Sequence, residues 1–345
     1  MNRLSYIIIF LFCAVGTVVW AGNPDRQGEA GAYELLINPW ARSAGLHSMN
    51  TSLVKGIDAM HVNPAGLSRI NKTEAGIGHT VYLSGTGIGV NSVGLSQRLG
   101  KNGALGISIM AMDFGDIQVT TTNQPEGTGG TFSPSFFNIG VGYSYTFENK
   151  ISVGAAVRGI SETTADVSAL GFCIDAGVQY VTGPKDNFKF GVSLRNIGSK
   201  MRFNGEGLAY PTRSDREDYV ITGQQRSAGF ELPSVLNLGV SYDFLFTKAL
   251  RLTAIGNFTS NAFGFDQTGA GIELALNEMF VLRGGYRHEL GQTSANKSAY
   301  TGLCGGFTVN IPLSKENPSS VGLDYSYQAT NPFSGTHNIG VRINL

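Results

Sequence analysis

Apolar residues recur at every second position along most of the sequence after residue 74. Residues 138–147 show the pattern clearly, because every odd position is apolar and every even position holds a small or polar residue. The odd positions are Ile139, Val141, Tyr143, Tyr145 and Phe147. Successive side chains of a β-strand point to opposite faces. The alternation therefore predicts a strand with one apolar face and one small, polar face.

Fourteen segments carry this alternation, and each contains between 9 and 15 residues. They are residues 74–83, 88–98, 103–114, 136–147, 151–162, 169–182, 188–197, 232–246, 250–259, 267–275, 279–288, 299–312, 319–329 and 337–345. A tilted strand needs about 9–11 residues to cross a bilayer, whereas strands of soluble proteins typically have about 5–6. Residues 74–345 are thus predicted to form an all-β fold, a 14-stranded antiparallel transmembrane β-barrel.

The lengths of the connections support the same fold. Connections after even-numbered segments are short, whereas residues 115–135, 198–231 and 289–298 follow odd-numbered segments. Outer-membrane barrels have short periplasmic turns and longer extracellular loops. A soluble β-sandwich, the alternative, has no reason to sort its loops by length. We therefore expect a multi-pass barrel in the outer membrane, with membrane lipid around it.

Composition excludes several classes of function. The chain has 25 basic and 25 acidic residues, so no net field attracts nucleic acid. No nucleophile-elbow, zinc-protease, paired-cysteine or dinucleotide-binding motif is present, and the five histidines lack metal-ligand spacing. We expect no enzyme, no cofactor and no metal site. The alternative is an outer-membrane hydrolase, for which His288 and Glu289 at a strand end are the candidates.

The first 21 residues are typical of a secretory signal peptide. Arg3 gives a basic start, residues 7–15 are continuously apolar, and a cleavage site is expected after Ala21. A membrane anchor is the alternative.

Residues 22–73 do not alternate but contain many apolar residues. We interpret them as a periplasmic or lumenal hatch, with residues 30–70 inside the barrel near its periplasmic mouth, because large barrels leave a lumen to fill. Arg42 lies in this apolar context and needs a partner when buried. A salt bridge from hatch to wall is the main interpretation, and ligand binding is the alternative.

Charges of both signs fall on inward positions of the predicted strands. They are Arg98, Arg158, Arg195, Arg251, Arg283, Arg287, Arg342, Asp175, Asp243, Glu273 and Asp324. If it faced lipid at the middle of the bilayer, each Arg would lower the stability of the barrel by about 2–4 kcal/mol. We expect a lumenal network that anchors the hatch, with a selective pore as the alternative.

Two short motifs in the hatch carry a family resemblance. Residues 35–45 read LLINPWARSAG, and Asn63, Pro64, Ala65, Gly66 and Leu67 form an NPAGL box. Together they resemble the PorV/PorQ family, and the box also resembles the wider long-chain fatty-acid transporter (FadL) barrels. The box itself is a turn, because proline fixes φ and asparagine can bond the backbone ahead. Shaping the hatch is its expected role, and direct ligand binding is the alternative.

The resemblance implies an outer-membrane barrel of the type IX protein secretion system. Such a protein would bind the C-terminal signal domain of secreted cargo, or subunits of the translocon or attachment complex. The sequence departs from the family pattern after Gly45, where it reads LHSM, so the paralogue stays open. A FadL-like outer-membrane transporter of hydrophobic small molecules is the alternative function.

The two longest loops are the expected partner-binding surface. Residues 198–231 mix aromatic and charged side chains, among them Phe203, Tyr210, Arg213 and Tyr219. Aromatic anchors with a polar rim are typical of protein interfaces. A lid that folds over its own barrel is the alternative.

Overall fold

The computed structural model describes residues 22–213, 219–247, 249–293, 297–313 and 319–345. The predicted signal peptide, residues 1–21, lies outside the described residues. Among the described residues, no helix is long and apolar enough to span a membrane.

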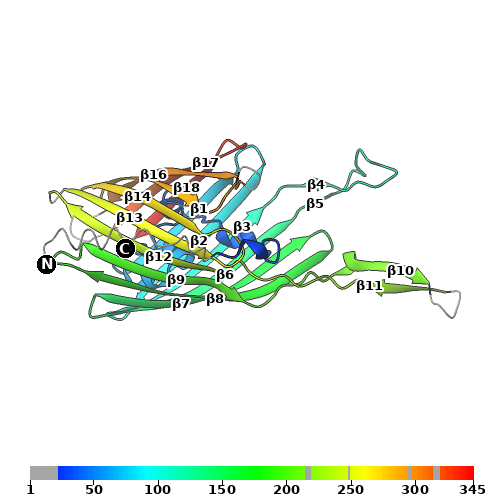
Figure 1. Cartoon of the computed structure of the whole chain (residues 1–345), viewed down its shortest axis with the longest axis horizontal. Helices are drawn as coiled ribbons and strands as arrows, with labels where there is room; N and C mark the ends of the chain where they lie inside the picture. The colour runs from blue at the N-terminus through cyan, green and yellow to red at the C-terminus, as the bar shows by residue number, and fades with distance from the viewer. Residues whose placement is uncertain (1–21, 214–218, 248, 294–296, 314–318) are drawn as a thin grey trace.

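Fourteen of the described strands form one closed antiparallel barrel, which confirms the predicted fold (Figure 1). They are β1 (Thr73–Tyr82), β2 (Ile88–Leu99), β3 (Gly103–Asp113), β6 (Ser135–Phe147), β7 (Ile151–Thr164), β8 (Val167–Thr182), β9 (Phe188–Gly198), β12 (Val235–Leu245), β13 (Leu250–Asn261), β14 (Gln267–Leu276), β15 (Phe280–Glu289), β16 (Tyr300–Pro312), β17 (Ser320–Thr330) and β18 (Thr336–Asn344). Each strand pairs with its neighbour in the chain, and β1 closes the ring on β18, with Glu74 opposite Asn344. Closure leaves no strand edge unpaired, as lipid requires.

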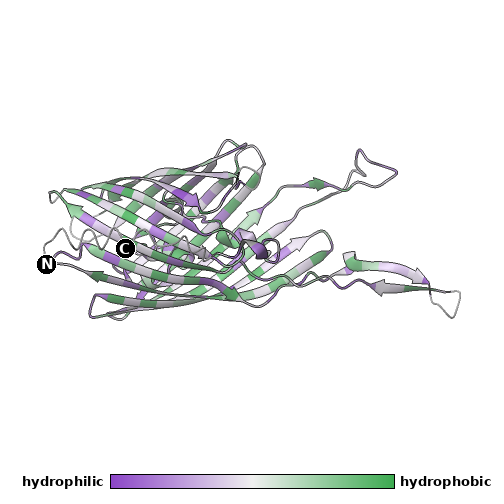
Figure 2. Cartoon of the chain, in the orientation of Figure 1, coloured by the Kyte–Doolittle hydropathy of each residue, from purple (hydrophilic) through white to green (hydrophobic). Residues whose placement is uncertain are grey.

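The alternation of the sequence becomes the two faces of the wall. Along β6, residues are exposed and buried in strict turn, so that Val141 and Tyr143 face outward while Ser144 faces the interior. Hydropathy alternates along most strands in the same way (Figure 2). The outward apolar side chains form a surface suited to lipid, so the barrel is of the transmembrane, outer-membrane type.

The two ends of the barrel differ. The C-terminus and the short turns lie at one end, and two hairpins project from the other (Figure 1). The hairpins are β4 (Ile117–Gln118) with β5 (Thr131–Phe132), and β10 (Ala209–Arg213) with β11 (Val220–Gln224). Both regions were expected to be plain loops. Neither hairpin folds over the barrel mouth (Figure 1), so the lid alternative is not supported.

The hatch fills the lumen with short helical turns joined by extended segments. The turns are η1 (Pro24–Arg26), η2 (Tyr33–Leu36), α2 (Ala41–Ala44), η3 (Gly56–Asp58), α3 (Ala59–Val62) and η4 (Pro64–Ser68). Inward glycines of the wall make room for it. A Cβ on Gly177 would lie 2.0 Å from Oδ1 of Asn63, and one on Gly154 would lie 2.4 Å from the carbonyl carbon of Pro64.

The hatch begins at the hairpin end rather than near the periplasmic mouth. Asn23 donates a backbone hydrogen bond to Asn261, and Ala30 forms a β-bridge with Glu231. The chain then runs through the lumen and reaches the short-turn end at residues 69–72, just before β1 begins at Thr73. The first part therefore departs from the expected position, because Leu35 finds its apolar contacts near the hairpin end, with Met112 and Phe136.

Candidate functional site

Two cavities lie at opposite ends of the lumen with the hatch between them. The inner cavity, about 1000 Å³, opens among the short turns. The outer cavity, about 510 Å³, lies at the hairpin end and includes residues of the hatch from Gln27 to Ser48. Each has a distinct chemistry.

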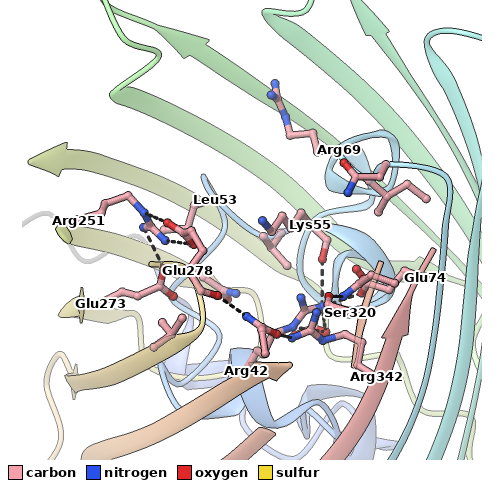
Figure 3. Close-up of a pocket in the computed structure, with 18 of the residues that line it drawn as sticks. Arg42, Leu53, Lys55, Arg69, Glu74, Arg251, Glu273, Glu278, Ser320 and Arg342 are labelled. Carbon is pink, nitrogen blue, oxygen red and sulfur yellow. Dashed lines mark hydrogen bonds and ion pairs between the residues drawn. The ribbon is translucent and has the colours of Figure 1, made fainter. Parts of the chain in front are cut away.

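Arg42 is the centre of the ion-pair network beside the inner cavity (Figure 3). Its Nη2 lies 2.6 Å from Oδ1 of Asp58 and 2.9 Å from Oε1 of Glu74, and all three side chains are nearly buried. Ser43 donates a hydrogen bond to the other Asp58 oxygen. Burial by itself would lower the pKa of Arg42, but the two carboxylates outweigh it and raise that pKa. Since Asp58 belongs to the hatch and Glu74 to β1, Arg42 fastens the hatch to the wall.

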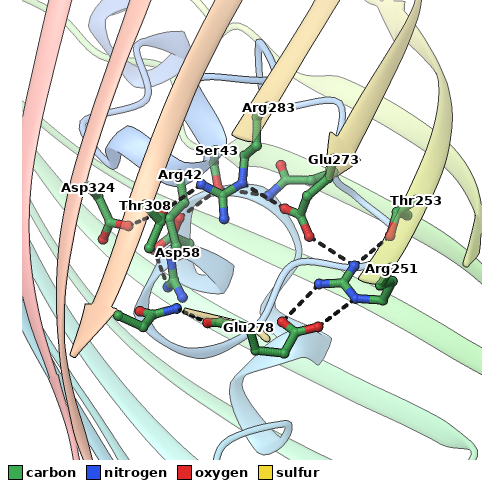
Figure 4. Close-up of polar contacts among 12 residues, drawn as sticks. Arg42, Ser43, Asp58, Arg251, Thr253, Glu273, Glu278, Arg283, Thr308 and Asp324 are labelled. Atoms are coloured by element: carbon green, nitrogen blue, oxygen red, sulfur yellow. Dashed lines mark hydrogen bonds and ion pairs between the residues drawn. The ribbon is translucent and has the colours of Figure 1, made fainter. Parts of the chain in front are cut away.

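A second network lines the inner cavity on the opposite wall (Figure 4). Glu273 lies between two arginines, with Arg251 at 3.0 Å and Arg283 at 2.7 Å. Arg251 also holds Glu278 at 2.7 Å. Most charges of this cavity are therefore neutralised by neighbours. Lys55 and Arg69 line it without an ion pair among the described residues.

The NPAGL box bonds to the hatch and the wall. Asn63 Oδ1 accepts the Ala65 N–H at 3.1 Å, and its Nδ2 donates to Thr51, Val178 and Val192 carbonyls. Leu67 fills the space above Gly106. All five box residues are buried, and none lines either of the two cavities. The geometry gives the box a structural role at the hatch–wall contact.

The outer cavity combines aromatic and aliphatic side chains with polar and charged ones, Glu289 and Lys297 among them. Its aromatic and aliphatic lining is Tyr33, Leu36, Ile37, Tyr82, Val235, Phe263, Phe265 and Tyr300. Arg195 (β9) and Arg287 (β15) also line it, and no ion pair to either is found among the described residues. Arg195 is 5% exposed, donates to the Leu35 carbonyl at 3.2 Å, and leaves its Nε without a partner. The nearest acid on the same wall, Asp175, is paired with Arg158 at 2.7 Å.

Two buried histidines, His47 and His61, lie close to these arginines. His47 is buried, contacts Gln328 at 2.9 Å and leaves its Nε2 without a partner. Burial, with the charge of Arg287, lowers the pKa of His47 well below its usual value. Burial also lowers the pKa of His61, with contributions from Arg195 and Arg158. Besides Arg195 and Arg287, the charged residues that line the outer cavity are Lys297 and Glu289.

The proposed partner-binding residues do not form one surface. Phe203 packs against Phe230 at the barrel rim, with ring centroids 5.7 Å apart. Tyr210 and Arg213 lie on β10, and Tyr219 immediately precedes β11. Tyr210 and Tyr219 are each about half exposed. Separately, no cluster of His, Cys, Asp and Glu suited to a metal occurs in the described part of the chain.

The sequence pointed to the outer cavity only in part. Inward parity identified Arg195 and Arg287, but whether they form ion pairs depends on which strands and hatch segments meet there. The aromatic residues Phe263 and Phe265 follow β13 and carry no periodic signal.

Comparisons with known proteins bear on the fold. No family model matches the sequence, and no curated protein matches it. Among solved structures, the monoaromatic hydrocarbon channel CymD is similar over 89% of this chain and 97% of its own, with a TM-score of 0.55 and 15% identity. The barrel is FadL-like. A FadL homologue of Pseudomonas aeruginosa is similar over 88% of this chain and 96% of its own, with a TM-score of 0.50 and 13% identity. A mutant of the monoaromatic hydrocarbon channel TodX is similar over 88% of this chain and 96% of its own, with a TM-score of 0.53 and 16% identity.

Proposed function

We propose that this FadL-like barrel takes up small hydrophobic molecules that carry an anionic group, and that the outer cavity is their first binding site. The observation that carries the proposal is the pair of arginines, Arg195 and Arg287, which form no ion pair among the described residues and line the cavity together with aromatic side chains. Ligand cavities of this kind are mostly apolar, with a few polar groups that fix orientation, and span about 300–1,000 Å³.

Electrostatics favours an anionic ligand over a neutral one. A desolvated arginine without a counter-charge carries a penalty of several kcal/mol. A ligand carboxylate would remove part of that penalty, and a planar guanidinium can bind it through two hydrogen bonds. The solved relatives named as hydrocarbon channels support the apolar part of the ligand. In this proposal the barrel binds and passes its ligand without changing it chemically.

Binding can be measured with a fluorescent long-chain carboxylate and its methyl ester on detergent-solubilised protein. The acid should bind saturably and more tightly than the ester. Charged hydrogen bonds contribute about 1.5–3 kcal/mol, so Arg287→Gln should weaken binding of the acid by about 10- to 150-fold. Arg251→Gln, which changes the inner cavity, is the matched control and should leave binding unchanged. Equal affinity for acid and ester would refute the proposal.

A second candidate function, protein binding in type IX secretion, rests on the hairpins. The β10–β11 hairpin projects far from the barrel (Figure 1), and Tyr210, Tyr219 and Val220 on it are exposed. A membrane barrel does not need such a hairpin to close. Together with the PorV/PorQ resemblance, it supports binding of secreted cargo or of translocon or attachment-complex subunits.

Deletion of residues 205–225 separates the two functions. If the hairpin binds a partner, the deletion should abolish co-purification of that partner from solubilised outer membrane. Heat-modifiable gel migration should persist, and so should binding of the fluorescent acid. If the partner still co-purifies with a folded barrel that lacks the hairpin, the hairpin is not the binding surface.

A further inference from the structure

The backbone nitrogen of Gly22 lies against a buried carboxylate at the hairpin end. It is 2.6 Å from Oδ2 of Asp266, in the connection between β13 and β14. Oδ1 of Asp266 accepts the Asn261 N–H at 3.1 Å. Asp266 is 4% exposed, so its carboxylate is almost fully removed from water.

The charge of this carboxylate is not balanced within the described residues. No arginine, lysine or histidine among them forms an ion pair with Asp266. Two amide N–H donors reduce the cost of burying a carboxylate but leave its charge uncancelled. Effective penalties for a buried, unpaired ion are several kcal/mol.

The space around residue 22 is built for a residue without a side chain. A Cβ there would lie 2.8 Å from the Gly264 carbonyl oxygen and 2.9 Å from the Asp266 nitrogen. Both are backbone atoms that cannot turn aside. Residue 22 is also the first residue after the predicted cleavage site at Ala21.

We propose that Asp266 is a binding site for the chain's own α-ammonium group, which signal-peptide removal creates at Gly22. A signal peptidase hydrolyses the Ala21–Gly22 peptide bond, so that water supplies the hydroxyl to the Ala21 carbonyl and a proton to the Gly22 nitrogen. The new amine takes a second proton from solvent at neutral pH, where an α-amino group is mostly charged. The neutral amide donor beside Asp266 thereby becomes a cation, and the buried carboxylate gains its counter-charge.

The contact would fasten the first part of the hatch to the barrel rim. Further along this arm, Arg26 lies over the Phe263 ring at 4.3 Å, and the Tyr33 hydroxyl donates to the Phe263 carbonyl. Gln27 and Tyr33 are part of the outer-cavity lining. The α-ammonium contact would therefore add to the contacts that hold one wall of that cavity in place. The inference does not depend on which ligand the cavity binds.

The test uses the full chain secreted to the outer membrane and purified in detergent. Mass spectrometry of the N-terminal peptide should show Gly22 as the first residue. Reductive methylation, which needs the neutral amine, then measures how strongly the ammonium is held. A neighbouring carboxylate raises an amine pKa by about 1–3 units, so labelling of folded protein should be at least about 10-fold slower than of heat-denatured protein.

Asp266→Asn keeps the shape of the side chain and removes its charge. It should accelerate labelling and shift the pH dependence of labelling to lower pH, while the Tyr33–Phe263 contact of the arm, followed by hydrogen exchange, should persist. Glu231→Gln is the matched control, because Glu231 pairs with Arg26 of the same arm at the exposed surface, and it should leave the rate unchanged. Gly22→Ala should also accelerate labelling, and it provides the test of the proposal if Asp266→Asn fails to fold. A first residue other than Gly22, or unchanged labelling in the folded variants, would overturn the proposal.

Discussion

Replacing Arg42 with glutamine should release the hatch from the inner wall. Arg42 is the shared cation of Asp58 and Glu74, whose side chains are 3% and 4% exposed. Without it, two carboxylates stay buried close to one another with no counter-charge. Breaking a buried ion pair by removing one partner typically costs about 3–5 kcal/mol. The equilibrium constant for local opening of the hatch should rise by about 150- to 4,000-fold.

Hydrogen exchange of peptides from residues 41–62 measures this opening directly. Trp40 gives a second signal, because it is the only tryptophan after residue 21 and is buried against the wall. Its emission should shift to the red. Lys55→Gln is the matched control, because Lys55 lines the same cavity without an ion pair among the described residues.

Neutralising Asp58 and Glu74 as well should restore much of the protection of the hatch against hydrogen exchange. A triple variant with Arg42→Gln, Asp58→Asn and Glu74→Gln removes the uncompensated charge, so it should open less than Arg42→Gln alone. Unchanged exchange in Arg42→Gln, or a triple variant that opens more than the single one, would refute the electrostatic reasoning.

Three further predictions concern the hatch and the wall. Gly177→Leu should displace Asn63 and expose the hatch to protease, because even a Cβ would lie 2.0 Å from the Asn63 amide oxygen. Burial lowers the pKa of His61 and of His47 below the usual 6.5, so only the opened hatch takes up their protons. The free energy of hatch opening should therefore be highest above pH 6.5 and fall as pH drops below it, by up to about 1.4 kcal/mol per pH unit for each histidine. Hydrogen exchange of a variant with both histidines replaced by glutamine should show a flatter pH profile. Val141→Arg, on the lipid face of β6, should lower barrel stability by about 2–4 kcal/mol in urea titrations in lipid vesicles.

Period-two alternation made the barrel predictable from the sequence. A lipid-facing strand must show an apolar residue at every second position, so segments such as β6 and β12 stand out without an alignment. The main boundary error has a local cause. The segment predicted from residue 232 starts as a strand only at Val235, because Pro233 cannot donate a ladder hydrogen bond.

The path of the hatch was less predictable, because short turns carry no long period. The sequence indicated that Arg42 needs a partner, but it did not identify Asp58, 16 residues away, or the position of both beside β1. The outer cavity was missed for a related reason. Tyr33, Arg195 and Phe263 meet only when the hatch and two distant strands come together. Gly22 and Asp266, 244 residues apart, meet in the same way.

A crystal structure of the protein soaked with a long-chain carboxylate tests the central proposal most directly. The account predicts ligand density in the outer cavity, with the carboxylate within hydrogen-bond distance of the Arg287 or Arg195 guanidinium and the apolar chain against Phe263 and Tyr300. Density for the carboxylate in the inner cavity beside Lys55, or an outer cavity that stays empty at saturating ligand, would contradict it.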